Sequence, residues 1–547
     1  MSGSAPGDDG AARTPAFVAV DLGATSGRVM LGVLHGELSG CARGIRRAES
    51  DNSRVELVET GRFPNGPVSV PRAGSEVADL RWDVLGLWRG IVDGLREAGR
   101  VAADRGARVA GIGVDSWAVD YGLLDDDGAL VGAPRSYRDP RILGASDRVD
   151  ARIPAAERYA VNGLQHLPFE TLHQLVAGTG DVSWARARGL LLIPDLVTCW
   201  LTGRQVAEVT NASTTGLLDA RTRQWSRDLL ARLGDEFDGL AGLGDLLSEL
   251  VEPGTVVGPL AEPLAAETGL GAVPVIAVAS HDTASAVAAI PLGVDRPGRA
   301  GNAPGNPAGP GRAAYVSSGT WSLVGLELDE PVLTEASRRA NVTNELGLDG
   351  TVRYLRNVMG LWVLDECVRE WRRGGDEVDL GALLAAAAEE PGGRCVVDVD
   401  SDAFLAPGDM PSRFRDAARA AGQEVPETRP ALVRAVLDSL AAAYARVVSI
   451  VSELAGVEVT AVHVAGGGVR NELLCRLTAE ATGLPVVAGP VEAAALGNVL
   501  VQARAVGALG TGPDGGPPGL PALRAVVVRS TDLATYRPAG ESTGAVR

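Results

Sequence analysis

The sequence predicts an α/β protein built from two similar halves, and two observations lead to this prediction. Short apolar runs typical of buried strands alternate with longer helical stretches along the chain. In addition, the runs at residues 17–20 and 314–316 are each followed by a turn of small polar residues and then by another apolar run. Strand, small turn and strand form a hairpin, so the repetition indicates a duplicated, two-lobed molecule.

The expected elements follow from periodicity. Apolar runs expected to form strands are residues 17–20, 109–114, 275–279, 314–316, 459–464 and 484–487. Helices are expected at 80–103 and 429–454, and the second of these repeats apolar residues at helical spacing. The Gly- and Pro-rich residues 291–312 lack such periodicity. We therefore expect a flexible insert there, between a first domain at 15–290 and a second at 313–540.

Both ends of the chain are expected to be disordered tails, at residues 1–14 and 541–547. The first tail is acidic and has no apolar core, so it does not resemble a secretory signal. The five cysteines form no C-x-x-C pair, which favours a reducing compartment. A cytoplasmic location is the expectation.

Composition and charge exclude several classes of protein. Of 547 residues, 46% are hydrophobic and 22% are charged, with a net charge of −18. Nucleic acids and anionic membranes attract positive surfaces, so neither is an expected partner. All 51 basic residues are arginine. P-loop NTPases, protein kinases and pyridoxal enzymes each need a lysine, so the chain belongs to none of these classes.

The turn within residues 21–28 has the composition of a phosphate-binding loop. Backbone N–H groups and hydroxyls in such a loop can approach phosphate oxygens closely. Arg28 would add positive charge, and Asp21 could hold Mg²⁺ through water. Residues 317–320 offer the same donors. Each turn alone is also compatible with a plain hairpin, but a transferring phosphoryl group needs donors on both sides.

Asp282 follows an apolar strand and is a candidate general base for a sugar hydroxyl. The alternative is a helix N-cap, a role that Thr283 or Ser280 could also fill. His281 beside it is, taken alone, more often structural than catalytic.

Two further segments fit a sugar and a nucleoside. Asp115, Trp117 and Asp120 combine carboxylates with an aromatic platform, although a buried tryptophan with solvated acids gives the same pattern. Glycines 466–468 allow a base or ribose to approach the backbone, or they form only a tight turn.

Together these segments resemble the FGGY family of sugar kinases. The two phosphate motifs correspond to residues 18–28 and 314–322, the adenosine segment to 462–498 and the catalytic segment to 278–287. Similar sugar-side stretches are 113–120, 137–141, 167–172, 341–344 and 356–362. The resemblance extends over most of residues 15–510. It implies the two-lobed actin/hexokinase/Hsp70-type ATPase fold, an α/β fold with a duplicated ribonuclease-H-like core and an interdomain cleft.

The resemblance also implies a reaction, in which ATP with Mg²⁺ phosphorylates the C1 hydroxyl of a ketose. L-rhamnulose is the expected ketose, and L-fuculose or a pentulose is the alternative. Asp282 is then the catalytic base, with Ala118, His281, Thr283 and Asn357 at the sugar. The implied nucleotide residues are Ala24, Thr25, Ser26, Gly27, Arg28, Thr320, Asp365 and Gly467. A nucleotide-dependent switch and a non-catalytic sugar sensor remain alternative functions, and monomer and dimer both remain open.

Three positions depart from the family pattern. Ala118 stands where glycine is expected, and its methyl group would narrow the sugar pocket. Asp365 stands where glutamine is expected, and an ionised carboxylate accepts hydrogen bonds but cannot donate them. Ala494 stands where a hydroxyl residue is common.

Overall fold

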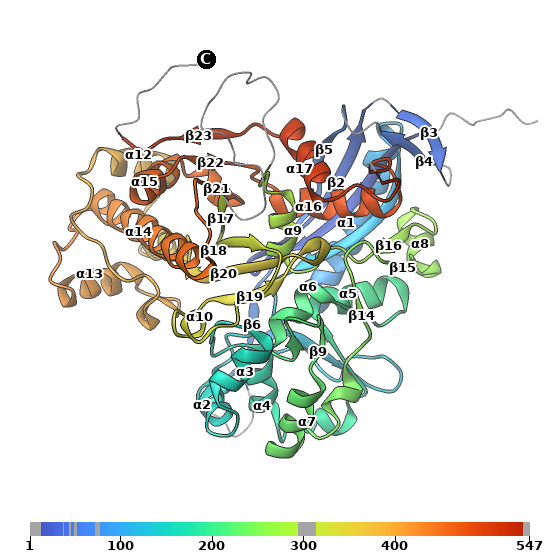
Figure 1. The fold of residues 1–547 in the computed structure, drawn as a ribbon, viewed down its shortest axis with the longest axis horizontal. Helices are drawn as coiled ribbons and strands as arrows, with labels where there is room; N and C mark the ends of the chain where they lie inside the picture. The colour runs from blue at the N-terminus through green and yellow to red at the C-terminus, as the bar shows by residue number, and fades with distance from the viewer. Residues whose placement is uncertain are drawn as a thin grey trace, which may run out of the picture.

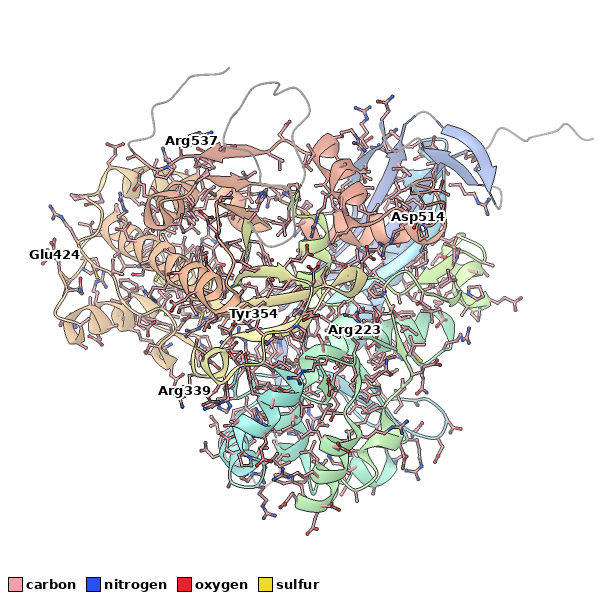
Figure 2. The ribbon with its side chains drawn as sticks, in the orientation of Figure 1. Arg223, Arg339, Tyr354, Glu424, Asp514 and Arg537 are labelled. Atoms are coloured by element: carbon pink, nitrogen blue, oxygen red, sulfur yellow. The ribbon has the colours of Figure 1, made fainter. Side chains whose placement is uncertain are left out.

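The computed structural model describes residues 13–36, 38–42, 45–48, 52–71, 77–293, 313–512 and 514–539. The expected tails, apart from residues 13 and 14, and residues 294–312 of the expected insert lie outside this part. Two large sheets with flanking helices form two lobes (Figure 1). Charged side chains such as Arg339 and Glu424 lie at the outer surface, whereas Tyr354 lies in the interior (Figure 2).

The first sheet has the strand order β15-β16-β8-β1-β2-β5. Its strands are β1 (Thr14–Leu22), β2 (Ser26–His35), β5 (Arg54–Pro64), β8 (Ala107–Ser116), β15 (Val256–Pro259) and β16 (Pro274–Ile276). Helix α1 (Val84–Asp104) places Gly94 against Val29 on one face, and helix α16 (Ala493–Ala505) places Val499 against Gly32 on the other. Because both faces are covered, residues 16–22 of β1 are all buried.

The second sheet repeats this plan, with the order β19-β20-β18-β17-β21-β22-β23. Its strands are β17 (Ala313–Ser318), β18 (Trp321–Leu328), β19 (Thr343–Leu346), β20 (Val352–Met359), β21 (Ala461–Ala465), β22 (Val486–Ala488) and β23 (Ala534–Tyr536). From β5 to β15, successive pairs are antiparallel, antiparallel, parallel, parallel and antiparallel. The pairs from β20 to β23 follow the same sequence. The β1–β2 and β17–β18 turns are therefore equivalent points of a duplicated core.

Two helices meet where the lobes join. α9 (Asp282–Ala289) follows β16, and α16 follows the equivalent strand β22. They pack so closely that a Cβ atom on Gly497 would lie 1.8 Å from the carbonyl oxygen of Ser285. α16 covers the first sheet, and Ser530 at the end of α17 (Leu520–Ser530) accepts a hydrogen bond from the N–H of Val55 in β5. Residues 493–530, placed by the sequence in the second domain, thus complete the core of the first lobe.

A smaller layer, cyan to green in Figure 1, extends the first lobe along one end of the molecule. It contains β9 (Tyr121–Leu124), β10 (Gly189–Leu192), α2 (Ala145–Asp150), α3 (Ala155–Asn162), α4 (Thr171–Gly178), α5 (Ile193–Thr202), α6 (Val209–Ala212) and α7 (Arg227–Glu236). Short strand pairs elsewhere are β3 (Leu38–Ala42) with β4 (Ile45–Ala48), β6 (Pro67–Val70) with β7 (Asp79–Trp82), β11 (Ala207–Glu208) with β14 (Leu250–Val251), and β12 (Leu218–Asp219) with β13 (Gln224–Trp225).

The remaining helices are α8 (Glu262–Thr268) in the first lobe and α10 (Glu335–Arg339), α11 (Trp362–Arg373), α12 (Leu380–Glu389), α13 (Met410–Ala420), α14 (Arg429–Ala455) and α15 (Glu472–Thr482) in the second. Among the described residues, α14 alone has the length and hydropathy to cross a membrane. Its most apolar window is 61% buried inside the protein, where the helix packs against α15, α12 and β18. This packing is that of a core helix.

Candidate active site

A cleft of about 430 Å³ lies between the lobes. Both hairpin turns, the glycines after β21 and the start of α9 border it. It brings together the sequence-predicted residues Asp21, Ala24, Thr25, Ser26, Arg28, Ala118, His281, Asp282, Thr283, Thr320, Asn357 and Gly467. Ala494 also lines it. Segments more than 400 residues apart in the chain therefore share one cavity, because the duplicated sheets place equivalent turns face to face.

The first turn is fixed by its own backbone and by a neighbouring strand end. The N–H of Gly23 donates to the carbonyl of Ser26 at 3.0 Å, and Asn65 Nδ2 donates to the carbonyl of Gly23 at 2.7 Å. Ser26 and Arg28 line the cleft. Side chains alternate along a strand, so Gly27 faces away, where a Cβ atom would collide with the ring of Phe63. Gly27, predicted at the nucleotide, lies outside the cleft lining.

Arg28 connects the two lobes at the phosphate end. Its guanidinium pairs with Asp21 in β1 and with Glu492 at the start of α16. Burial opposes the charged form, but Asp21 and Glu492 together raise the pKa of Arg28. Burial raises the pKa of Asp21, and the Arg28 charge offsets part of that shift. The arginine is thus held as a permanent cation facing the cavity.

The second and third turns pack directly against each other. The N–H of Gly319 donates to the carbonyl of Trp321 at 2.9 Å, which closes the β17–β18 turn. Gly466 has φ +85°, and a Cβ atom on Gly468 would lie 2.0 Å from Ser318 Oγ. Only glycines fit this contact. Their packing leaves Thr320 and Gly467 facing the cleft.

Asp282 is the first residue of α9, and His281 is the N-cap residue. The side chain of Asp282 is 31% exposed. Its Oδ1 accepts hydrogen bonds from Thr283 N at 2.6 Å and Thr283 Oγ1 at 3.2 Å, so Oδ2 takes no part in either bond. The carboxylate lies in the cleft near the positive end of the helix dipole, a favourable position for negative charge.

A buried ion network holds His281. Its Nε2 lies 3.4 Å from Asp282 Oδ1, and its Nδ1 lies 3.3 Å from Glu345 Oε2. Arg353, which is completely buried, places its Nη1 3.0 Å from Glu345 Oε2 and donates from Nε to the carbonyl of Leu346. Burial would raise the pKa of Glu345, but Arg353 and His281 hold it below its usual range. Glu345 is therefore a buried carboxylate that orients the imidazole beside Asp282.

Removing the charge of Glu345 is expected to destabilise the protein. In Glu345→Gln the guanidinium of Arg353 stays buried without a counter-ion, so the free energy of unfolding should fall by about 3–5 kcal/mol. The double variant Glu345→Gln/Arg353→Met removes both charges and should recover part of that loss. Urea denaturation measures both values. A loss below about 0.5 kcal/mol for the single variant, the usual effect of a surface substitution, would contradict this account.

The opposite end of the cleft is aromatic and fits a sugar. Trp117, Tyr137 and Phe169 line it, together with Ala118. Gln165 Oε1 accepts hydrogen bonds from the N–H of Asn357 at 2.8 Å and from Asn357 Nδ2 at 3.1 Å. This contact ties the small layer of the first lobe to β20 of the second.

Two carboxylates expected to face a sugar do not line the cleft. Asp120 is completely buried and accepts hydrogen bonds from Trp82 Nε1 at 2.6 Å, Trp117 Nε1 at 3.0 Å and Gln174 Nε2 at 2.9 Å. It positions the tryptophans. Asp115 is also buried and accepts from Asn498 Nδ2 at 2.6 Å. Trp117 lines the cleft as predicted, whereas both carboxylates are instead hydrogen-bonded to buried side chains.

Asp365, predicted at the nucleotide, is exposed in the first turn of α11 and is not part of the cleft lining. Conversely, the sequence missed Glu345, Arg353, Arg470 and Glu492. Arg470 and Glu492 lie inside the predicted adenosine segment 462–498, and Glu345 directly follows the stretch 341–344, but no pattern gave any of these residues a role of its own. The partner of Glu492, Arg28, lies 464 positions earlier in the chain. Glu345 and Arg353 pair across the neighbouring strands β19 and β20, in a register that no single run of residues reveals.

The residues at the phosphate end fit a Mg²⁺ ion. Asp115 is the cross-strand partner of Asp21. The charges of Asp21, Asp115 and Asp282 act on one another. Burial and the charge of Asp21 raise the pKa of Asp115 well above its usual range. Asp115 Oδ1 has no hydrogen-bond partner among the described residues. A hydrated divalent cation beside the predicted phosphate turns would stabilise the ionised form of these two neighbouring carboxyl groups, which burial disfavours.

Comparison with known proteins agrees with this geometry. The FGGY family of carbohydrate kinases matches with its N-terminal domain at residues 73–289 and its C-terminal domain at residues 314–506. A curated rhamnulokinase of Bacteroides thetaiotaomicron is 39% identical over 95% of this chain and 96% of its own length. A rhamnulokinase of Pectobacterium carotovorum is also 39% identical, over 96% of this chain and 94% of its own.

Solved structures confirm the expected fold. Ligand-bound xylulose kinase from Lactobacillus acidophilus superposes with a TM-score of 0.70 at 15% identity, covering 96% of this chain and 94% of its own. Plasmodium falciparum glycerol kinase with ADP gives a TM-score of 0.68 at 12% identity over the same shares. The two-lobed α/β architecture is thus shared with xylulose kinase and glycerol kinase. The chain belongs to the FGGY family of carbohydrate kinases.

Proposed function

We propose that this protein transfers the γ-phosphoryl group of ATP to the C1 hydroxyl of L-rhamnulose. The observation that carries the proposal is the position of Asp282, in one cleft with two phosphate-type turns and an aromatic sugar wall. The choice of ketose rests on the rhamnulokinases that match nearly the whole chain. Cytoplasmic location is part of the proposal, because the reaction needs cellular ATP.

In the proposed reaction, Asp282 accepts the proton of the C1 hydroxyl while the hydroxyl oxygen of the ketose attacks the γ-phosphorus. The new C1–O–P bond forms as the bond from the γ-phosphorus to the β-phosphate oxygen breaks, and ADP leaves with those electrons. Backbone donors of both turns and the cation of Arg28 stabilise the charge on the transferring group. His281, held by Glu345, and Asn357 orient the sugar.

Asp21 is the residue proposed to hold Mg²⁺ through water, with Asp115 behind it. When bound, the ion would supply charge stabilisation to the phosphates. Ala118 and Trp117 would shape the sugar pocket, while Thr320 and Gly467 would contact the nucleotide.

A coupled assay for ADP with a panel of ketoses tests the function. With ATP and Mg²⁺, L-rhamnulose is expected to give the highest kcat/KM, above L-fuculose and D-xylulose, since one mismatched sugar contact costs about 10-fold or more. ADP formation that no ketose stimulates would favour a nucleotide switch. A higher kcat/KM for another ketose would reassign the substrate within the family.

A further inference from the structure

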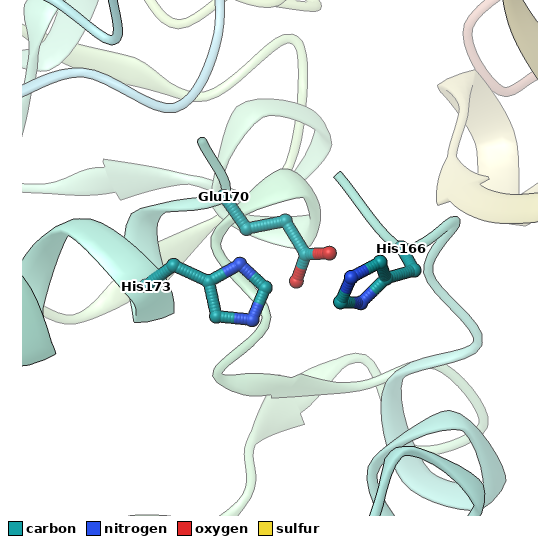
Figure 3. A group of neighbouring side chains, drawn as sticks. All are labelled: His166, Glu170 and His173. Atoms are coloured by element: carbon teal, nitrogen blue, oxygen red, sulfur yellow. The ribbon is translucent and has the colours of Figure 1, made fainter. Parts of the chain in front are cut away.

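A second cluster of ligand-type side chains lies beside the sugar end of the cleft, where the chain enters α4. It consists of His166, Glu170 and His173, each of which offers one ligand atom, and these three atoms lie within 4.8 Å of one another. Glu170 immediately precedes α4, and its carboxylate lies between the two imidazole rings (Figure 3). Glu170 at the N-cap and His173 in the first turn of α4 are three residues apart, and the non-helical segment before the helix brings His166 to the same place.

His173 is held in the tautomer that a metal ligand needs. Its Nδ1 lies 2.8 Å from the carbonyl oxygen of Leu167, and because a carbonyl can only accept, Nδ1 carries the proton. Nε2 therefore presents a lone pair. His173 is completely buried, and this Nε2 has no hydrogen-bond partner within the described part of the chain. A buried, unsatisfied acceptor is costly, whereas a histidine whose other nitrogen bonds a carbonyl is typical of metal sites.

The other two ligands are also held in place. The N–H of Leu167 donates to Glu170 Oε1 at 3.0 Å, so the backbone of one residue, Leu167, orients both Glu170 and His173. The N–H of His166 donates to Asn341 Oδ1 at 2.8 Å, which anchors this segment to the second lobe. The side chain of His166 is exposed, so an ion could enter from solvent.

We propose that His166, Glu170 and His173 bind one Zn²⁺ ion, with a fourth position open to water. Two imidazoles and a carboxylate are a donor set that zinc takes, whereas Mg²⁺ prefers oxygen ligands and water. The same segment contributes Gln165, Leu167 and Phe169 to the cleft lining. The bound ion would therefore fix one wall of the sugar site.

One nearby charge opposes a cation. Arg158 is buried and acts electrostatically on both Glu170 and His173. Its guanidinium, however, pairs with Asp150 at 2.7 Å and donates to the carbonyl of Ile153. Asp150 therefore partly neutralises this positive charge.

Calorimetric titration of untagged, metal-stripped full-length protein with Zn²⁺ tests the site, with excess Mg²⁺ present and no sugar or nucleotide. One equivalent is expected to bind. Loss of an outer partner of a metal ligand already costs about 10–100-fold in affinity, so His166→Ala should weaken binding by at least about 100-fold. His35→Ala is the matched control, because His35 also lies beside a carboxylate, 3.2 Å from Glu56, and should leave binding unchanged.

Two further measurements complete the test. Co²⁺ should give the intense visible absorption of a four-coordinate site in the wild type and in His35→Ala, but not in His166→Ala. Zn²⁺ should raise the Tm of the wild type and of His35→Ala, and leave the Tm of His166→Ala unchanged. Equal Zn²⁺ affinity in His166→Ala and the wild type, or no saturable binding in the wild type, would overturn the proposal. Because neither ATP nor a ketose is used, this outcome is independent of the proposed kinase activity.

Discussion

Asp282→Asn is expected to lower kcat for ketose phosphorylation by about 10²–10⁴-fold, the usual contribution of a positioned general base. Asparagine keeps the size and hydrogen-bonding ability of the side chain at the start of α9 but cannot accept the hydroxyl proton. KM for the ketose and the thermal midpoint should change little, because the carboxylate is partly exposed and its other contacts are local. Steady-state kinetics and thermal denaturation measure these quantities.

Asp228→Asn is the matched control, since Asp228 lies in the first turn of α7, exposed and away from the cleft. Its kcat should equal that of the wild type. A folded Asp282→Asn variant with nearly full turnover would disprove the role of Asp282 as the base.

Gly497→Ala is expected to lower stability and turnover together. The added methyl group would lie 1.8 Å from the carbonyl oxygen of Ser285, which is backbone and cannot rotate away. Inserting a methyl group into a packed core costs about 1–3 kcal/mol, occasionally more. α9 would have to shift, and Asp282 with it, so kcat should fall together with the urea midpoint.

Gly381→Ala provides the comparison. Gly381 lies in α12, is exposed, and its added Cβ would approach only the side chain of Asp379, at 3.3 Å. In an exposed helix this substitution is neutral or stabilising by up to about 1 kcal/mol. If Gly497→Ala proved as stable as the wild type, α9 and α16 would be less closely packed than described.

The fold was predictable from the sequence where the pattern is local and repeated. Helix 429–454 corresponds to α14 at Arg429–Ala455, and both hairpins form at the predicted turns. The expected strand 275–279 is shorter, ending at Ile276, because the residues after it keep only isolated contacts with the sheet, such as the bridge between Ser116 and His281, before α9 begins. Strand ends depend on pairing with other segments, which a single run of residues does not encode.

The candidate site was predictable where it is made of turns and strand ends. The paired glycine–hydroxyl turns and Asp282 all border the cleft, and the geometry adds physical reasons for their composition. Charged residues whose partners are distant were not predictable. Arg353 contacts His281 across 72 positions of the chain, and Asp120 meets Trp82 across 38. No spacing rule connects such pairs before the chain is folded.

The packing of the carboxyl-terminal helices α16 and α17 on the first lobe has a consequence for biosynthesis. Gln502 Nε2 in α16 donates to the carbonyl of Val18 in β1, 484 positions earlier. While a ribosome is still translating the second lobe, one face of the first sheet has nothing to cover it. The amino-terminal lobe can therefore reach its native state only once almost the whole polypeptide has been released. Until then the apolar face of the first sheet stays exposed, unless a chaperone binds it.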